Sequence, residues 1–105
     1  MSPQAIVAFV PDLADRSRLA IAIPGVVFAT RLDDAVGAGT VVIDLGRSPV
    51  PVAEARSVAP SALIVCFGPH VDVEAAAAAR AAGADRVMPR SRFFRDPAAA
   101  LIDTF

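Results

Sequence analysis

The stretch TVVIDLG, from Thr40 to Gly46, decides how this chain is expected to fold. Its first four residues are apolar or β-branched, which indicates a strand that is buried on both faces. The carboxylate of Asp44 and the glycine that follows mark the end of this strand. In open α/β sheets, binding and catalytic groups gather at the carboxyl ends of the strands. Asp44 is therefore the first candidate for a functional side chain.

Strand-length apolar runs alternate with helical segments along the rest of the chain. Strands are expected at 5–10, 26–29, 40–44, 62–67 and 86–88. Helices are expected at 12–23, in two turns after a Thr30 cap, at 51–58, from Asp72 through five consecutive alanines, and from Asp96-Pro97 to about 104. This alternation predicts right-handed crossovers and a parallel sheet. The expected fold is a three-layer α/β/α sandwich with a five-stranded parallel sheet, in a single domain over residues 1–105.

Composition excludes several kinds of function. Ten basic and eleven acidic residues give a net charge of −1, which argues against a nucleic-acid or anionic-membrane surface. All ten basic residues are arginine, so lysine chemistry is excluded. The lone cysteine, Cys66, lies in an apolar strand and is expected to be a core residue. No signal-peptide pattern and no apolar run of roughly 20 residues is present, so we expect a cytoplasmic protein.

Three motifs in the second half carry a family resemblance. They are FGPHVD at 67–72, AAGAD at 81–85 and MPRS at 88–91. With the five strand–helix units, they resemble the response-regulator receiver domain, a CheY-like domain with flavodoxin-like topology. The resemblance implies the strand order 2-1-3-4-5. Receivers hold Mg²⁺ with an acidic pair after the first strand and are phosphorylated on an aspartate after the third.

By this resemblance, Asp44 matches the phosphorylated aspartate. The acidic pair falls on Val10 and Pro11, and Asp12 lies one residue later, where it either caps the following helix or partly replaces the pair. From the residues alone, Asp44 is either a remnant acceptor or metal ligand, or a carboxylate that accepts hydrogen bonds from loop amides or pairs with Arg90. Asp15 and Arg18 are expected on the polar side of the first helix.

The remaining receiver positions are also changed. Gly68 stands where receivers carry a hydroxyl, Arg90 where they carry a lysine, and Val87 where they carry an aromatic switch residue. Arg90 is expected to form an ion pair across the strand ends or to bind an anion. The resemblance therefore implies a pseudo-receiver without phosphotransfer, with no catalytic residue, metal or other cofactor. His70 is interpreted as a loop residue because it has no partners at metal-ligand spacing.

A group of arginines near the end of the chain surrounds two phenylalanines. Arg92, Phe93 and Phe94, with Val87 in the preceding strand, form the candidate interface. Neighbours in a helix or strand cannot both face the core, so one phenylalanine should be partly exposed. In receivers, the face made by the fourth helix, fifth strand and fifth helix is the usual contact surface.

The function that this sequence favours is a stand-alone regulatory module, not an enzyme, that binds a protein partner or a second copy of itself. One alternative is a divergent, working receiver, phosphorylated on Asp44 with Mg²⁺ held by Asp12 and Asp15. A further alternative is a small-molecule-binding α/β protein, for which the strand ends offer only Asp12, Asp44, His70 and Arg90.

Overall fold

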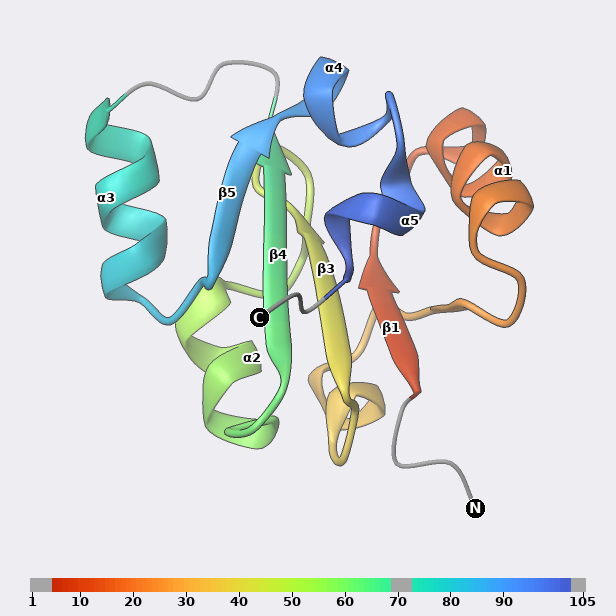
Figure 1. Cartoon of the computed structure of the whole chain (residues 1–105). Coiled ribbons are helices and arrows are strands. Elements are labelled where there is room, and N and C mark those ends of the chain that lie inside the picture. Colours follow the sequence, from red (N-terminus) through yellow and green to blue (C-terminus); the bar gives the residue numbers. More distant parts are fainter. Residues whose placement is uncertain (1–4, 69–72, 103–105) are drawn as a thin grey trace.

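A computed structural model describes residues 5–68 and 73–102 of the chain. Its sheet has five parallel strands in the order β2-β1-β3-β4-β5 (Figure 1). The strands are β1 (Ile6–Phe9), β2 (Val27–Phe28), β3 (Thr40–Asp44), β4 (Leu63–Gly68) and β5 (Arg86–Pro89). The predicted fold class and strand order are confirmed.

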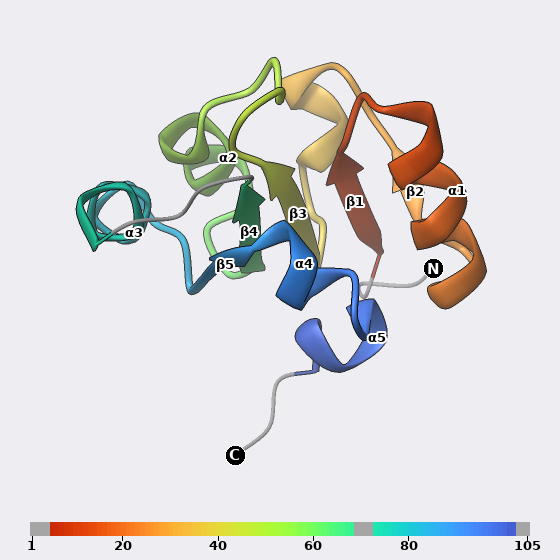
Figure 2. The same ribbon diagram turned by 90° about the horizontal axis from the view of Figure 1, so that it is seen from above.

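Helices cover both faces of the sheet (Figure 2). They are α1 (Leu13–Ala22), the 3₁₀ helix η1 (Leu32–Ala35), α2 (Val52–Val58), α3 (Val73–Ala81), α4 (Arg90–Phe93) and α5 (Pro97–Ala100). Residues of η1, α2 and α3 pack in one buried cluster, and residues of α1, α4 and α5 pack in another on the opposite face. We call these two sides of the sheet the α2 face and the α1 face.

Two expected helices differ from the structure. After β2, the two-turn helix capped by Thr30 is replaced by η1, whose cap position is Arg31 and carries no side-chain cap bond. At the other end, α4 forms one turn directly after β5, and α5 stops at Ala100. The Asp96 cap is confirmed, since its carboxylate accepts a bond of 3.2 Å from the Ala99 amide. The predicted Asp72 cap lies outside the described residues.

The central strands are buried on both sides, as their sequences predict. Residues 41–44 of β3 and 64–68 of β4 are all buried. Cys66 is fully enclosed, which confirms it as a core residue, and burial raises the pKa of its thiol to about 12. On the α1 face, the ring of Phe67 stacks on that of Phe93 with 4.7 Å between centroids.

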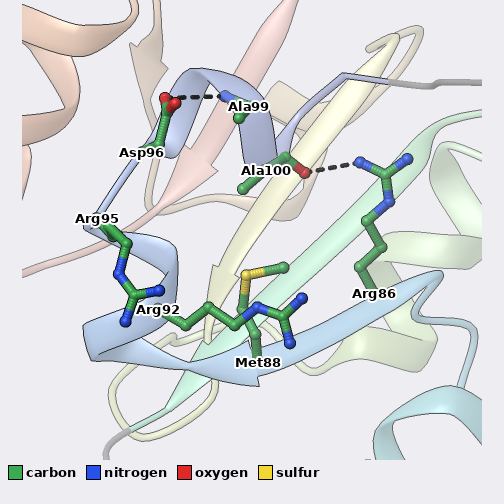
Figure 3. A pocket seen from close by; sticks show the side chains of 7 residues that line it. All are labelled: Arg86, Met88, Arg92, Arg95, Asp96, Ala99 and Ala100. Atoms are coloured by element: carbon green, nitrogen blue, oxygen red, sulfur yellow. Dashed lines mark hydrogen bonds between the residues drawn. The ribbon is translucent and has the colours of Figure 1, made fainter.

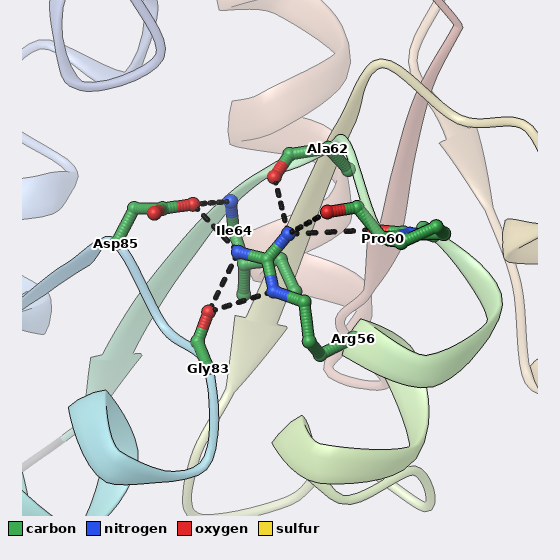
Figure 4. A network of polar contacts seen from close by, with 7 residues as sticks. Arg56, Pro60, Ala62, Ile64, Gly83 and Asp85 are labelled. Atoms are coloured by element: carbon green, nitrogen blue, oxygen red, sulfur yellow. Dashed lines mark hydrogen bonds and ion pairs between the residues drawn. The ribbon is translucent and has the colours of Figure 1, made fainter.

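Arg56 joins the start of β4 to the turn before β5 (Figure 4). Its guanidinium donates to the carbonyl oxygens of Gly83 at 2.6 Å and Ala62 at 2.8 Å, and to Asp85 Oδ2 at 2.8 Å. The same Asp85 oxygen accepts a bond of 2.8 Å from the Ile64 amide. This Arg56 network ties the end of α2 to two strands, so we expect it to stabilise the fold.

Candidate functional site at the carboxyl ends of the strands

Asp44 is buried where β3 ends, with 1% of its surface exposed. One carboxylate oxygen accepts a bond of 3.0 Å from the Gly46 amide. The other has no hydrogen-bond partner among the residues that the structure describes. The expected bond from a loop amide is thus confirmed. The alternative pairing of Asp44 with Arg90 is wrong, because Arg90 binds a different carboxylate.

That carboxylate belongs to Asp15 in α1. Arg90 Nη2 lies 2.6 Å from Asp15 Oδ1, and the Asp15 side chain is only 3% exposed. The hydrogen bond to Asp15, with the nearby charge of Asp44 as a weaker contribution, raises the pKa of Arg90. The guanidinium also lies over the rings of Phe67 and Phe94, 5.8 and 5.3 Å from their centroids. Arg90 therefore forms an ion pair, as expected, but its partner Asp15 lies in α1 and not at the end of a strand.

Asp15 lies on the buried side of α1, so its predicted place on the polar side of that helix is wrong. Asp15, Leu19 and Ile23 are all buried, and they follow one another at intervals of four residues. This spacing puts them on one helix face, so the sequence pattern already indicated that Asp15 faces the core. A carboxylate on that apolar face requires a cation opposite, and Arg90 provides it.

Asp12 caps α1, as predicted. One of its oxygens accepts a bond of 3.0 Å from the Asp15 amide, and the other lies 2.8 Å from Arg47 Nη1. The bond from the Asp15 amide, followed by the contact with Arg47, lowers the pKa of Asp12. Arg47, in the loop after β3, was not anticipated as a site residue. Both oxygens of Asp12 are thus engaged by protein groups.

A hollow of ≈340 Å³ lies at this edge, lined by Asp44, Gly46, Arg47 and Arg90. Gly68 ends β4 beside it and contributes no side chain. Mg²⁺ requires several oxygen ligands in octahedral geometry. Across residues 5–68 and 73–102, no three Asp, Glu, His or Cys side chains are grouped to hold a metal ion. The residues at this edge therefore do not fit the magnesium site of a receiver. His70 lies outside the described part of the chain.

The candidate interface is divided between the two faces of the sheet. Phe93 is fully buried against Phe67, so its expected role as a contact residue is wrong. Phe94 is partly exposed, as predicted for one of the pair, although its ring also packs against Phe67. Val87 in β5 packs on the α2 face, whereas Phe94, which follows α4, packs on the α1 face. Val87 and Phe94 cannot belong to one flat surface, whereas Arg92 is exposed.

The fold matches solved structures of receiver-like proteins. A response regulator protein from Burkholderia pseudomallei, with a phosphorylated aspartic acid, calcium ion and citrate, superposes with a TM-score of 0.79 at 18% identity, over 95% of this chain and 67% of that one. The CheY-like protein tadZ from Pseudomonas aeruginosa superposes with 0.70 at 23% identity, over 96% and 91%. A pilus assembly-related protein from Burkholderia pseudomallei superposes with 0.67 at 14% identity, over 91% and 86%.

These likenesses define the chain as having a receiver-like, CheY-like fold, as the sequence resemblance implied. No protein-family model matches the sequence, and no curated protein matches it either. Among the described residues, no helix is long and apolar enough to cross a membrane.

Proposed function

We propose that this chain is a pseudo-receiver, a signal-transduction module of the cytoplasm that acts by binding a protein and performs no phosphotransfer. The observation that carries the proposal is the ion pair between Arg90 and the buried Asp15. A receiver needs the cation at the end of its fifth strand to contact the phosphoryl group on the acceptor aspartate. Here that cation is already bound to a carboxylate of the first helix.

The other groups at this edge support the same proposal. Gly68 has no hydroxyl to donate to a phosphoryl oxygen. Asp12 is engaged by the Asp15 amide and by Arg47, so it is not free to bind a metal ion. Among the described residues at this edge, no nucleophile is paired with a base, so we assign the chain neither an enzymatic activity nor a cofactor.

The solved structures with this fold are compatible with either phosphotransfer or protein binding. One is described with a phosphorylated aspartic acid, and another is described as pilus assembly-related. The fold by itself therefore does not decide between phosphotransfer and binding, and the side chains at the strand ends carry the distinction.

One observation favours the alternative, a working receiver. The second oxygen of Asp44 has no hydrogen-bond partner in the described structure and lies beside the ≈340 Å³ hollow. An unpaired buried carboxylate oxygen is where a metal ion or a phosphoryl group would attach. The two candidate functions therefore differ in whether Asp44 reacts.

Beryllofluoride with Mg²⁺ tests this difference, because it mimics an aspartyl phosphate. We expect amide NMR signals of Gly46 and Arg90 to stay unchanged when beryllofluoride is added at millimolar Mg²⁺. Asp44→Asn is the matched control. A Mg²⁺-dependent change at these amides in the native protein, absent from Asp44→Asn, would overturn the proposal and establish the working receiver.

A further inference from the structure

A groove remains open on the α1 face, next to β5 (Figure 3). α5 has four residues, and beside it lies a hollow of ≈350 Å³. Strand alternation brings Arg86 and Met88 to this side, while Val87 packs on the other. The groove is bordered by Met88, Ala99 and Ala100, which are apolar, and by Arg86, Arg92 and Arg95. It lies apart from the hollow at Asp44.

Within the described part of the chain, the three arginines of this groove form no ion pair with a carboxylate. Arg86 donates one bond of 2.8 Å to the Ala100 carbonyl, and Arg92 and Arg95 are exposed. Asp96 also lines the groove, but one of its oxygens accepts from the Ala99 amide as the cap of α5. Three positive charges therefore face one negative charge, which leaves the groove basic.

This basic surface continues past the groove. A neighbouring hollow of ≈500 Å³ shares Arg95 and is also lined by Arg18, Arg90 and Phe94. Five of the ten arginines in the chain thus line these two hollows, although the whole chain carries a net charge of −1. Such an uneven distribution of charge attracts and orients an acidic partner.

Apolar groups lie among the arginines. Met88 lines the groove and Phe94 lines the neighbouring hollow, and both are half-buried. Methionine adapts its shape to different apolar contacts, and arginine binds carboxylates with two parallel hydrogen bonds. A surface of this kind fits a segment that presents carboxylates and apolar side chains together. A nucleic acid would bring charge but little aliphatic surface to cover Met88 and Ala99.

We propose that this arginine-rich groove docks an acidic, amphipathic segment of a partner protein. Carboxylates of the segment bind Arg86, Arg92 and Arg95, and its apolar side chains cover Met88 and Ala99. The inference rests on the proposed function, because it supplies the chemistry of the partner that a pseudo-receiver would bind.

The test is an NMR titration with a defined probe, a ten-residue peptide made only of glutamate and leucine in alternating pairs. We expect the amide signals of Met88, Arg92 and Ala99 to move. The double variant Arg92→Glu/Arg95→Glu should bind about tenfold more weakly. Arg80→Glu, which reverses a single charge on the exposed side of α3, is the control for Arg92→Glu alone and should bind as the native protein does.

Several results would overturn the docking site. One is an equal change in the amide signals when glutamine replaces glutamate in the peptide. Another is movement of amide signals outside the groove, and a third is no change at millimolar peptide. If inorganic phosphate moved the same amide signals equally, the groove would bind anions in general and not an acidic peptide. Tighter binding of an oligothymidine would make it a nucleic-acid surface.

The two proposals fail in different ways. A Mg²⁺-dependent beryllofluoride response at Gly46 and Arg90 would overturn the pseudo-receiver and leave the groove untouched. Failure of the peptide to bind would remove the acidic partner and leave the absence of phosphotransfer in place.

Discussion

Replacing Arg56 with alanine should destabilise the protein more than any change to an exposed arginine. The Arg56 side chain is 25% exposed and joins three separate segments. Its substitution leaves the carbonyl oxygens of Gly83 and Ala62 without their charged donor. It also removes the Cγ methylene of Arg56, which lies so close to Gly83 that a Cβ added there would come within 2.9 Å of it.

The size of the loss follows from the individual contacts. A hydrogen bond to a charged group contributes roughly 1.5–3 kcal/mol, and the bonds to Gly83 and Ala62 are the short ones. The ion pair with Asp85 is discounted to below about 1 kcal/mol, because the Asp85 side chain is 45% exposed. Bonds to Ala59 and Pro60 are longer, at 3.4 and 3.1 Å. Since water can reach part of the site, we expect a total near 3 kcal/mol.

Urea denaturation followed by circular dichroism measures this loss, since the chain has no tryptophan for fluorescence. For a domain of this size, about 3 kcal/mol lowers the midpoint by roughly 2 M urea. Arg56→Lys keeps the charge without the planar fork and should still lose at least half of that stability. The control is Arg47→Ala, whose side chain is 61% exposed in its pair with Asp12 and should cost less than about 1 kcal/mol. Equal midpoints for Arg56→Ala and Arg47→Ala would refute the reasoning.

Two further predictions concern the buried core. Phe93→Ala should lower the free energy of unfolding by about 3–5 kcal/mol in the same urea assay, because the Phe93 ring is fully buried. Phe94→Ala should lower it clearly less, because Phe94 is partly exposed. A larger loss for Phe94→Ala than for Phe93→Ala would contradict this reasoning. The pKa of Cys66 is raised to about 12 in the folded protein, so its contribution to stability is complete below pH 9 and is lost as pH rises from about 9 toward 12. The chain has neither lysine nor tyrosine, so Cys66→Ala should flatten the pH dependence of the urea midpoint between pH 9 and 11, and an unchanged slope would refute this assignment.

The fold was predictable because each strand carries its own signal. Residues 40–44 form a strand with the predicted bounds, and the other strands differ from prediction by one or two residues at an end. The helices were less predictable where propensity is weak. The segment after Thr30 contains two aspartates and ends near Gly37, whose φ of 78° only glycine adopts readily. Only one 3₁₀ turn forms there, and no sequence rule distinguishes such a turn from a short α-helix.

The candidate site was less predictable, because it depends on contacts between distant segments. The positions of Asp44 and Asp12 and the loss of a hydroxyl at Gly68 were readable from the sequence. The partner of Arg90 was not, since it lies 75 residues away in α1. Asp15 could have been recognised from its spacing to Leu19, which places it on the buried side of that helix. A charged residue on an apolar face indicates that a partner exists, but only the packed structure identifies which one.

The strand-end edge holds two buried carboxylates, those of Asp15 and Asp44, and Arg90 forms an ion pair with Asp15 alone. Asp15 and Asp44 are 2% and 1% exposed, and the charges of both raise the pKa of Arg90, with Asp15 dominant through its hydrogen bond. If Arg90 turned to a phosphoryl group on Asp44, Asp15 would remain as a buried charge without a partner, which is among the most costly arrangements in a protein interior. Phosphorylation would therefore work against the packing of α1 on the sheet. The ion pair between Arg90 and Asp15 holds α1 on the sheet, and under the proposed function the same ion pair opposes phosphorylation of Asp44.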